Sequence, residues 1–210
     1  MKQFDNKIVL IGGGGHCLSC IDVIESHNKF KIIGIIEKHS ELKIKEKYGY
    51  PIIGTDKDLH KIFNLCNNAL IAFGFIKNVK ERIQLYNQIR KLQFKTPSFV
   101  SPYSYFSKRA KISDGSIIMH GCTINAGVKI KRNCIINSST LIEHESIIGS
   151  NCHISTGVKI NGNCLVGDGT FIGSGSVIFE GLDIKPYSVI PAGSVVNQKF
   201  LKLFNEKNNE

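Results

Sequence analysis

The chain has 210 residues, 42% of them hydrophobic, and a formal net charge of +10 at neutral pH. This length allows one or two domains with buried cores, and the hydrophobic fraction is ordinary for a water-soluble globular protein. No apolar run approaches the roughly eighteen residues of a membrane span. The N-terminal residues lack the long apolar region and the small-residue cleavage site of a signal peptide, so we expect a cytoplasmic protein.

The excess of basic residues admits two interpretations. A nucleic-acid partner is one of them, but Lys is spread along the whole chain, and no helix-turn-helix, zinc-finger or Arg/aromatic pattern accompanies it. A diffuse positive charge keeps a protein soluble and favours small anionic ligands such as nucleotides. We therefore expect a nucleotide-bearing ligand and no nucleic acid.

The first hundred residues alternate between apolar runs and amphipathic stretches. The predicted elements are strands at 7–11, 31–36 and 69–74, a short extended segment at 50–54, and helices beginning after residue 16 and spanning 55–65 and 79–92. We expect Thr55 or Asp56 to cap the second helix. Alternation of this kind is typical of a small parallel sheet with helices on its faces, so residues 1–100 are predicted to form a Rossmann-like α/β domain.

A glycine turn, Gly12 to Gly15 and then His16, follows the first strand. At the N-terminus of a helix such a turn can present backbone N–H groups to an anion. Cys17 stands where the dinucleotide fingerprint has its third glycine, which disfavours NAD. Contact with a phosphate or nucleotide is one interpretation, and a turn needed only for packing is the other. Glu37 ends the second strand, where the ligand crevice of a parallel sheet lies.

From Ile112 to Val196 an aliphatic residue stands at every sixth position, Ile in most cases and otherwise Val, and a mostly small residue follows four positions later. A strict period of six is produced neither by an α-helix nor by a strand, and it is typical of a β-helix. Residues 101–197 are therefore predicted to wind into a triangular coil with the aliphatic side chains stacked inside. Residues 198–210 are expected to form a short helix and a frayed end.

Small and turn-forming residues occupy the gaps of this repeat. We expect a positive φ or a sharp turn at the corner residues Asn125, Gly149, Asn161, Gly167 and Gly173. Cys122, Cys134, Cys152 and Cys164 fall on the small position and are expected to be buried hydrophobic side chains.

The remaining cysteines include a C-x-x-C pair, Cys17 and Cys20, with Cys66 far from them in sequence. A zinc site needs four ligands, and no second pair follows. We interpret the pair as two small residues on one helix face, with a redox or metal role as the alternative. No metal is expected.

Catalytic chemistry on a β-helix must use outward-facing residues, because the interior is a packed core. His144 lies between Glu143 and Glu145, and an imidazole beside a carboxylate can accept a proton near neutral pH. His153 lies nine residues further on, half a turn of the coil away, so the two histidines share a groove only if a second subunit closes it. His120 has no adjacent carboxylate. For each of them the alternative is a solvated histidine without a role.

Taken together, these segments resemble the bacterial sugar acyltransferases of PglD/NeuD type, which include UDP-amino-sugar N-acetyltransferases and sialic-acid O-acetyltransferases. The resemblance covers nearly the whole chain. Its segments are GGHC at 14–17, PIIG at 51–54, IAFG at 71–74 with Arg82 after it, LIEHE at 141–145 with IIGSNCHIS at 147–155, and the glycine-rich hexads from Asn161 to Ile178.

The resemblance implies a left-handed β-helix, a homotrimer, and acetyl-CoA bound along the groove between two β-helices. It implies His144 as the general base and Glu145 as the carboxylate that orients it. For acetyl-CoA it implies contacts at His153, which would lie at the thioester carbonyl, and at Gly162, Ser174 and Ala192. For the sugar nucleotide it implies Gly14, Gly15, His16, Glu37, Lys38 and Gly74.

Three features depart from the family pattern. Glu37-Lys38 stands where two acidic residues are common, Phe75 replaces a polar residue, and the chain after Val196 lacks the usual G-x-P-A-K segment. The hold on the sugar nucleotide and on the adenine end of CoA is therefore expected to differ from that of other members.

The resulting hypothesis is an N-acetyltransferase for the amino group of a nucleotide-linked amino sugar, of the UDP-4-amino-sugar type. It would serve the synthesis of surface glycans or glycoprotein precursors, and the amine would attack the thioester directly. One alternative is an O-acetyltransferase of sialic acid or a related nonulosonic acid. The other is a non-catalytic β-helix partner of a glycan biosynthetic enzyme.

Overall fold

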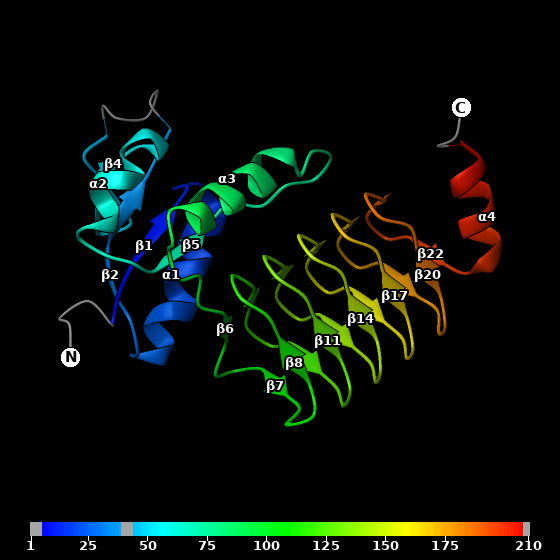
Figure 1. The fold of residues 1–210 in the computed structure, drawn as a ribbon. Helices are drawn as coiled ribbons and strands as arrows, with labels where there is room; N and C mark the ends of the chain where they lie inside the picture. The colour runs from blue at the N-terminus through cyan, green and yellow to red at the C-terminus, as the bar shows by residue number, and fades with distance from the viewer. Residues whose placement is uncertain (1–5, 39–43, 208–210) are drawn as a thin grey trace. The chain divides into compact units, whose positions relative to one another are not determined.

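The computed structural model describes residues 6–38 and 44–207. By its internal contacts the chain divides into two compact units, Met1–Ser101 and Pro102–Glu210 (Figure 1). None of the helices in the described part of the chain has the length and apolar character that a bilayer crossing requires.

The first unit is a small α/β domain, as the sequence predicts. Its sheet has the order β3-β4-β2-β1-β5, and every pair is parallel except β3 with β4. The strands of this sheet are β1 (Lys7–Ile11), β2 (Lys31–Ile36), β3 (Glu46–Lys47), β4 (Tyr50–Gly54) and β5 (Ala69–Ile71), and the short strand β6 (Phe99–Val100) is not part of it. The helices are α1 (Gly15–His27), α2 (Leu59–Phe63), which follows the 3-10 turn η2 (Asp56–Asp58), and α3 (Lys80–Lys91).

The predicted cap of the second helix is present. The Thr55 hydroxyl accepts a hydrogen bond from the Lys57 N–H at 3.3 Å, and the Thr55 N–H donates to the Asp58 carboxylate at 3.0 Å, which completes a capping box. The helix predicted to reach residue 65 ends two residues earlier, at Phe63.

The strand predicted at 69–74 ends early, at Ile71, because Arg82 binds the carbonyl groups that would have continued it. The Arg82 guanidinium donates to the carbonyl oxygens of Ile71 and Phe73 at 3.1 and 2.6 Å. This arginine is fully buried on α3, a helix whose basic residues the sequence pattern places outside. The hairpin between β3 and β4 was also not predicted; it turns at Tyr48 and Gly49, both with positive φ.

The second unit is a left-handed parallel β-helix, as predicted. Figure 1 shows its coils as successive rungs from β7 to β22. Its strands are β7 (Tyr105–Phe106), β8 (Lys111–Ile112), β9 (Ile117–Ile118), β10 (Thr123–Ile124), β11 (Lys129–Ile130), β12 (Ile135–Ile136), β13 (Leu141–Ile142), β14 (Ile147–Ile148), β15 (His153–Ile154), β16 (Lys159–Ile160), β17 (Leu165–Val166), β18 (Phe171–Ile172), β19 (Val177–Ile178), β20 (Asp183–Ile184), β21 (Val189–Ile190) and β22 (Val195–Val196).

Each strand pairs in parallel with the strand three elements away, so residue i lies beside residue i+18. Ile124 pairs with Ile142, and Ile142 with Ile160. The three faces of the coil are the sheets β7-β10-β13-β16-β19-β22, β8-β11-β14-β17-β20 and β9-β12-β15-β18-β21. From Ile118 to Val196 the aliphatic repeat residues are at most 1% exposed, which makes a column of stacked side chains the core of the unit.

The positive-φ corners do not lie where the sequence predicts them. They recur three residues after each repeat aliphatic, at Gly115, Gly121, Gly127, Asn133, Ser139, Glu145, Asn151, Gly157, Asn163, Gly169, Gly175, Gly181, Tyr187 and Gly193. The residues predicted for this role, Asn125, Gly149, Asn161, Gly167 and Gly173, come one residue after the aliphatic, and none has positive φ. Gly149 is instead required by close approach, because a Cβ there would lie 2.6 Å from the backbone nitrogen of Asp168 in the next coil.

The small position forms polar links between coils in addition to packing. The Ser146 hydroxyl donates to the Asn161 carbonyl at 2.9 Å and accepts from the Cys164 N–H at 3.1 Å. The predicted burial of the repeat cysteines is confirmed. Their thiols also contact corner carbonyls, as Cys152 does with Gly167 at 3.2 Å. Satisfying these buried carbonyls is a second reason for the choice of Ser, Thr and Cys at this position.

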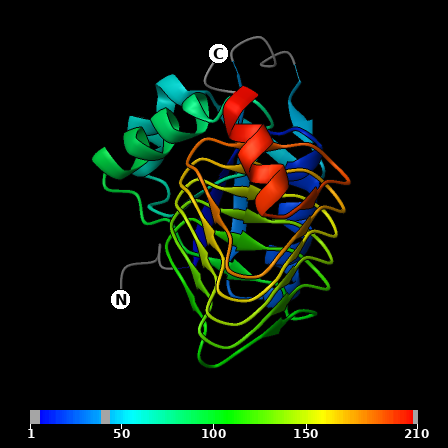
Figure 2. The same cartoon turned by 90° about the vertical axis from the view of Figure 1, so that its right-hand side faces the viewer.

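The predicted C-terminal helix is α4 (Gln198–Lys207). Asn197 precedes it and accepts a hydrogen bond from the Phe200 N–H at 2.9 Å, which is the geometry of a helix cap. Leu201 is buried, and Figure 2 shows α4 lying across the last coil. The helix therefore covers the open end of the stacked core.

We expect the column of aliphatic residues to carry much of the stability of the β-helix. Ile160→Ala should lower the free energy of unfolding by about 2–5 kcal/mol, because it leaves a cavity in a fully buried layer. The control is Lys159→Ala, at the exposed neighbouring position of β16, which should change it by less than about 0.5 kcal/mol. Thermal unfolding of both variants measures the difference, and equal effects would contradict the stacked core.

Candidate functional site

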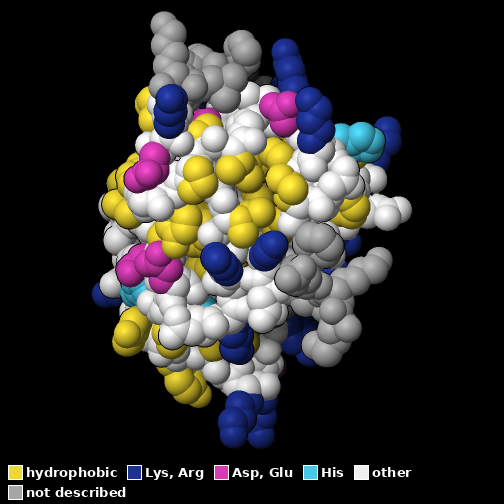
Figure 3. All heavy atoms as spheres, turned by 90° about the vertical axis from the view of Figure 1, so that its left-hand side faces the viewer, with side chains coloured by type: hydrophobic (Ala, Val, Ile, Leu, Met, Phe, Trp, Pro, Cys, Tyr) yellow, Lys and Arg dark blue, Asp and Glu magenta, His cyan; other side chains and the backbone are white. Residues whose placement is uncertain are grey.

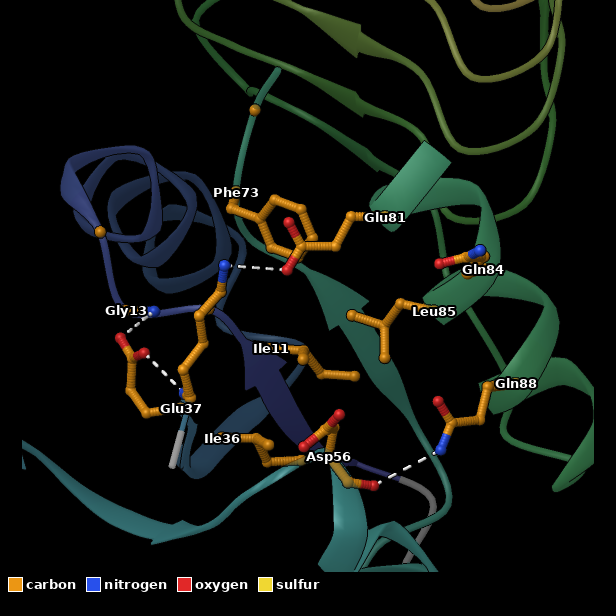
Figure 4. A pocket seen from close by; sticks show the side chains of 14 residues that line it. Ile11, Gly13, Ile36, Glu37, Asp56, Phe73, Glu81, Gln84, Leu85 and Gln88 are labelled. Carbon is orange, nitrogen blue, oxygen red and sulfur yellow. Dashed lines mark hydrogen bonds and ion pairs between the residues drawn. The ribbon is translucent and has the colours of Figure 1, made fainter. Parts of the chain in front are cut away.

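The first unit holds a pocket of about 620 Å³ at the carboxyl ends of its central strands (Figure 4). A crevice at this edge is where parallel α/β sheets bind their ligands. Residues from the ends of β1, β2 and β5 and from one face of α3 line it: Ile11, Gly12, Gly13, Gly14, Ile36, Glu37, Lys38, Asp56, Phe73, Gly74, Glu81, Gln84, Leu85 and Gln88.

The glycine turn has two specific backbone requirements. Gly12 has φ of +95°, and a Cβ at this position would also meet the Phe73 ring. A Cβ on Gly13 would displace the Glu37 carboxylate, so glycine at this position lets the carboxylate approach the turn. The Gly13 N–H donates to Glu37 Oε1 at 2.5 Å. Gly14 then caps α1 with extended backbone, so the N-terminus of this helix begins at the pocket.

Glu37 is the electrostatic centre of this turn. Its carboxylate is only 8% exposed and accepts hydrogen bonds from the Lys47 ammonium and the Lys38 N–H, each at 3.0 Å, in addition to the Gly13 N–H. Burial alone would raise the pKa of Glu37. The Lys47 ammonium and the two backbone N–H groups outweigh burial and hold this pKa below its ordinary value of 4.5. Glu37 is therefore an anion at neutral pH that fixes the conformation of the glycine turn.

Lys38, the residue after Glu37, forms an ion pair with Glu81 of α3. Their charged atoms lie 2.9 Å apart, and both side chains are well exposed. The hydrogen bond to Glu81 raises the pKa of Lys38. Figure 4 shows Glu81 beside the Phe73 ring, so the ion pair joins the end of β2 to α3 on this side of the pocket. Such an exposed pair contributes little stability, so an anionic ligand can compete for the Lys38 ammonium at small cost.

The structure gathers only some of the predicted substrate-binding residues in this pocket. Gly14, Glu37, Lys38 and Gly74 line it, whereas Gly15 and His16 do not. Sequence reasoning missed Asp56, Glu81, Gln84 and Gln88. Glu81, Gln84 and Gln88 have the spacing of one helix face, and this signal is present in the sequence. The spacing does not show, however, that this face of α3 lines a pocket.

In the second unit, His144 lies at the corner between β13 and β14. Its imidazole is 56% exposed, and Ala126 and Gly162 precede and follow it by one coil. A Cβ on Gly162 would lie 2.5 Å from the imidazole Cε1, so the ring rests directly against the Gly162 backbone. The small neighbours leave one side of the ring open to solvent.

The two glutamates beside His144 have different environments. Glu145 has φ of +60°, and its carboxylate lies 3.8 Å from His144 Nδ1, close enough for an ion pair but too long for a hydrogen bond. Glu143 instead accepts a hydrogen bond from the Asn125 amide at 2.9 Å. Glu145 is thus the carboxylate nearest to the imidazole.

The other predicted CoA-binding residues lie on a different part of the coil. His153 is on β15 and packs edge to face against Phe171 of the next coil, with ring centroids 5.2 Å apart. Ser174 and Ala192 are exposed and stack one coil apart at the following corner, where Ser174 shares a hydrogen bond with Ser155 at 2.8 Å. Within one chain the structure therefore joins Gly162 with His144, and Ser174 with Ala192, but it does not join the two groups.

The C-x-x-C pair is placed as two small residues on one face of α1. Cys17 and Cys20 are both fully buried, and burial raises the pKa of the Cys17 thiol to about 12. A thiol with so high a pKa is a poor nucleophile and a poor metal ligand. Within residues 6–38 and 44–207 there is no group of three or more His, Cys, Asp or Glu side chains arranged to hold a metal ion.

Basic side chains are scattered over the face drawn in Figure 3, and several lie next to acidic or hydrophobic ones. They do not gather into one stripe on this face. The basic stripe that tracks a nucleic-acid backbone is thus absent from the face that the figure shows.

Two family models together account for most of the chain. Residues 7–89 match the PglD N-terminal domain, and residues 94–201, slightly more than half of the chain, match the GMPPB C-terminal domain. The chain belongs to the hexapeptide-repeat sugar acyltransferase family of PglD/NeuD type. The first match covers the residues that line the pocket, and the second covers the coils that carry His144 and His153.

Solved structures share the fold of this PglD/NeuD-type protein. The acetyltransferase domain of PglB from Neisseria gonorrhoeae FA1090, in complex with acetyl coenzyme A, has a TM-score of 0.84 and 24% identity over 92% of this chain and 91% of that chain. PerB from Caulobacter crescentus, in complex with CoA and GDP-perosamine, has a TM-score of 0.84 and 24% identity over 91% of this chain and 89% of that chain. WeeI from Acinetobacter baumannii AYE has a TM-score of 0.65 and 20% identity over 90% and 96%.

The lowered pKa of Glu37 makes a prediction about stability and pH. A depressed pKa in the folded state contributes stability above the unfolded pKa of about 4.5, and this contribution is lost as the pH falls through the folded pKa. Glu37→Gln should therefore lower the thermal midpoint most at pH 7, and its effect should shrink as the pH falls below about 4.5. Glu46→Gln, on an exposed position of the neighbouring β3, is the control. A destabilisation by Glu37→Gln that is the same at pH 7 and pH 3.5 would contradict the assignment.

Proposed function

We propose that this protein is an acetyl-CoA-dependent N-acetyltransferase that acts on the amino group of a nucleotide-linked amino sugar. The product would serve the synthesis of surface glycans or glycoprotein precursors. One observation carries the proposal. The same chain has a pocket at the N-terminus of α1, where an anion can bind, and an exposed imidazole, His144, on a hexapeptide-repeat β-helix. The acetyl-CoA and the GDP-perosamine bound to structurally similar proteins support both halves of the proposal.

The pocket of the first unit is the proposed site of the sugar nucleotide. A diphosphate would lie against the glycine turn, where the N-terminus of α1 favours an anion and Lys38 supplies a positive charge. Gly74 would complete this wall, and the Glu37 carboxylate would accept hydrogen bonds from hydroxyl groups of the ligand and not face the diphosphate. Gly15 and His16 belong to the proposed site only through the N-terminal turn of α1, because they do not line the pocket in this state.

The proposed reaction is a direct acyl transfer. The amine nitrogen attacks the thioester carbonyl, a C–N bond forms, and the C–S bond breaks to release CoA. His144 would accept the proton that the amine loses, and Glu145 would stabilise the imidazolium that results. His153 would stand near the thioester oxygen, where a hydrogen-bond donor stabilises the developing negative charge. No acyl-enzyme is needed.

Acetyl-CoA would lie along the β-helix, in contact with Gly162, Ser174 and Ala192. Gly162 lies at the corner of His144, whereas Ser174 and Ala192 lie at another corner of the β-helix. A single groove can therefore hold them all only if a second β-helix supplies the opposite wall. This argument supports a homotrimer in which each site is shared by two chains. The expected location remains the cytoplasm.

An O-acetyltransferase of sialic acid or a related nonulosonic acid is the second candidate. Its support is the same imidazole, since a base at His144 can remove a proton from a hydroxyl group as well as from an amine. The pocket favours the first candidate, because the glycine turn and Lys38 offer a place for a diphosphate that a free sialic acid does not have.

The test is a transfer assay with acetyl-CoA and a panel of acceptors, read by product mass. The panel contains UDP- and GDP-linked amino sugars together with free and CMP-linked sialic acids. We expect a gain of one acetyl group that survives mild base, as an amide does. His144→Ala should lower kcat by at least about 100-fold without changing the thermal midpoint, since a general base typically contributes that much.

The control is His60→Ala, which removes an exposed histidine of α2 outside both proposed sites and should leave kcat unchanged. A base-labile acetyl group on a sialic acid would move the assignment to the O-acetyltransferase. No product with any acceptor would favour the non-catalytic partner. Full activity of His144→Ala would remove the proposed base.

The shared groove predicts the assembly state. Light scattering of the full chain should give three times the chain mass of 23.3 kDa. A monomer that transfers acetyl at the same protein concentration would contradict the shared site, because each groove would then have one wall.

A further inference from the structure

We propose that Asp56, together with Gln84 and Gln88 of α3, forms the nucleobase end of the pocket and selects guanine over uracil. This inference rests on the proposed function, because it assumes that the pocket holds a nucleotide-linked sugar. It departs from the expectation of a UDP-sugar and assigns a role to three residues that lie outside the motifs of the sequence.

The pocket has two chemically different ends. One end carries the glycine turn and Lys38, which suit phosphate groups. The other carries Asp56 and the amide of Gln88, and the Gln84 amide lies one turn back along α3, on the side of Glu81. Figure 4 shows Leu85 and Ile11 between these ends and the Asp56 carboxylate beside Ile36. A flat base lying over the aliphatic side chains would therefore present its edge to polar groups.

The Asp56 carboxylate differs from the other carboxylates of the pocket because no hydrogen bond or ion pair among the described residues involves it. Glu37 accepts three hydrogen bonds, and Glu81 is paired with Lys38. Among the described residues, no hydrogen bond or ion pair engages the Asp56 carboxylate, and only its backbone carbonyl is contacted, by the Gln88 amide at 3.5 Å. An exposed and unpaired carboxylate in a pocket is free to accept hydrogen bonds from a ligand.

Local structure holds Asp56 in place without using its side chain. The capping box of Thr55 and Asp58 fixes the backbone on either side of it, and Thr55 is buried. The Asp56 carboxylate therefore faces the pocket from a rigid turn, which is the preorganisation that a recognition group needs.

The chemistry of the two bases decides the preference. The Watson–Crick edge of guanine carries two adjacent donors, the N1–H and the N2 amino group, and a carboxylate can accept from both. Uracil has a single N3–H between two carbonyl oxygens, and these oxygens would repel a carboxylate. A glutamine amide can donate to a base carbonyl, such as the guanine O6, and fits beside the carboxylate. Asp56 with the Gln88 amide beside it, and with Gln84 one turn away on α3, thus matches guanine.

The test measures binding of GDP and of UDP to the full-length protein by calorimetry. The wild type should bind GDP more tightly than UDP. Asp56→Asn should weaken GDP by at least about tenfold, since a bidentate contact to a base typically discriminates by that factor or more. The same variant should bind UDP equally well or better, because an asparagine amide can both donate to and accept from uracil.

Two further variants separate the two ends of the pocket. Glu81→Gln acts on the Lys38 end and should change GDP and UDP binding by the same factor. Asp22→Asn, at an exposed position of α1 outside the pocket, should change neither. Thermal unfolding checks that each variant is folded.

The outcomes distinguish this inference from the proposed function. Tighter binding of UDP than of GDP by the wild type overturns the inference and leaves a nucleotide-sugar enzyme. Equal weakening of both nucleotides by Asp56→Asn does the same, and it would make Asp56 a residue that only stabilises the N-terminus of the short helix. Binding of neither nucleotide, with no product in the transfer assay, overturns the proposed function and this inference with it.

Discussion

The eighteen-residue register of the coil is the constraint on which the β-helix depends. Each strand of the β-helix has only two residues and is not stable by itself. Pairing residue i with residue i+18 satisfies the backbone groups and, in the same step, stacks one aliphatic side chain on the next. Every outward position then has fixed neighbours one coil before and one coil after it. The His144 ring lies against Gly162 because of this register, and not because of any local turn preference.

The pocket of the first unit depends on a buried charge. Glu37 is stable as an anion because the Lys47 ammonium and two backbone N–H groups surround it. One of these N–H groups belongs to Gly13, so the carboxylate and the glycine turn fix each other. Lys47 lies on β3, so the β3–β4 hairpin at the edge of the sheet supplies the positive charge that pairs with Glu37. On the other side, Arg82 ends β5 and sets the start of the segment that carries Phe73 into the pocket.

The candidate residues of the β-helix show how a repeat makes a site without disturbing its core. The inward positions keep the aliphatic column, while corner positions vary freely because their side chains meet solvent. A histidine whose neighbours one coil away are small is accessible to solvent. A glycine at the same corner lowers stability little, because hydrogen bonds between coils hold the backbone there.

The sequence alone predicted the repeat and both kinds of domain, because these depend on local periodicity and on spacing along the chain. It placed the aliphatic column and the buried cysteines correctly. It failed at the positive-φ corners, since a glycine required by the approach of the next coil looks the same as one required by φ; only the stacked coils separate Gly149 from Gly157. It also could not find Asp56, Gln84 and Gln88, because their common pocket exists only after β4, β5 and α3 have packed together. Arg82 is the clearest case: a helix pattern assigns a charged residue to the surface, and two free carbonyl groups at the end of β5 decide that it is buried.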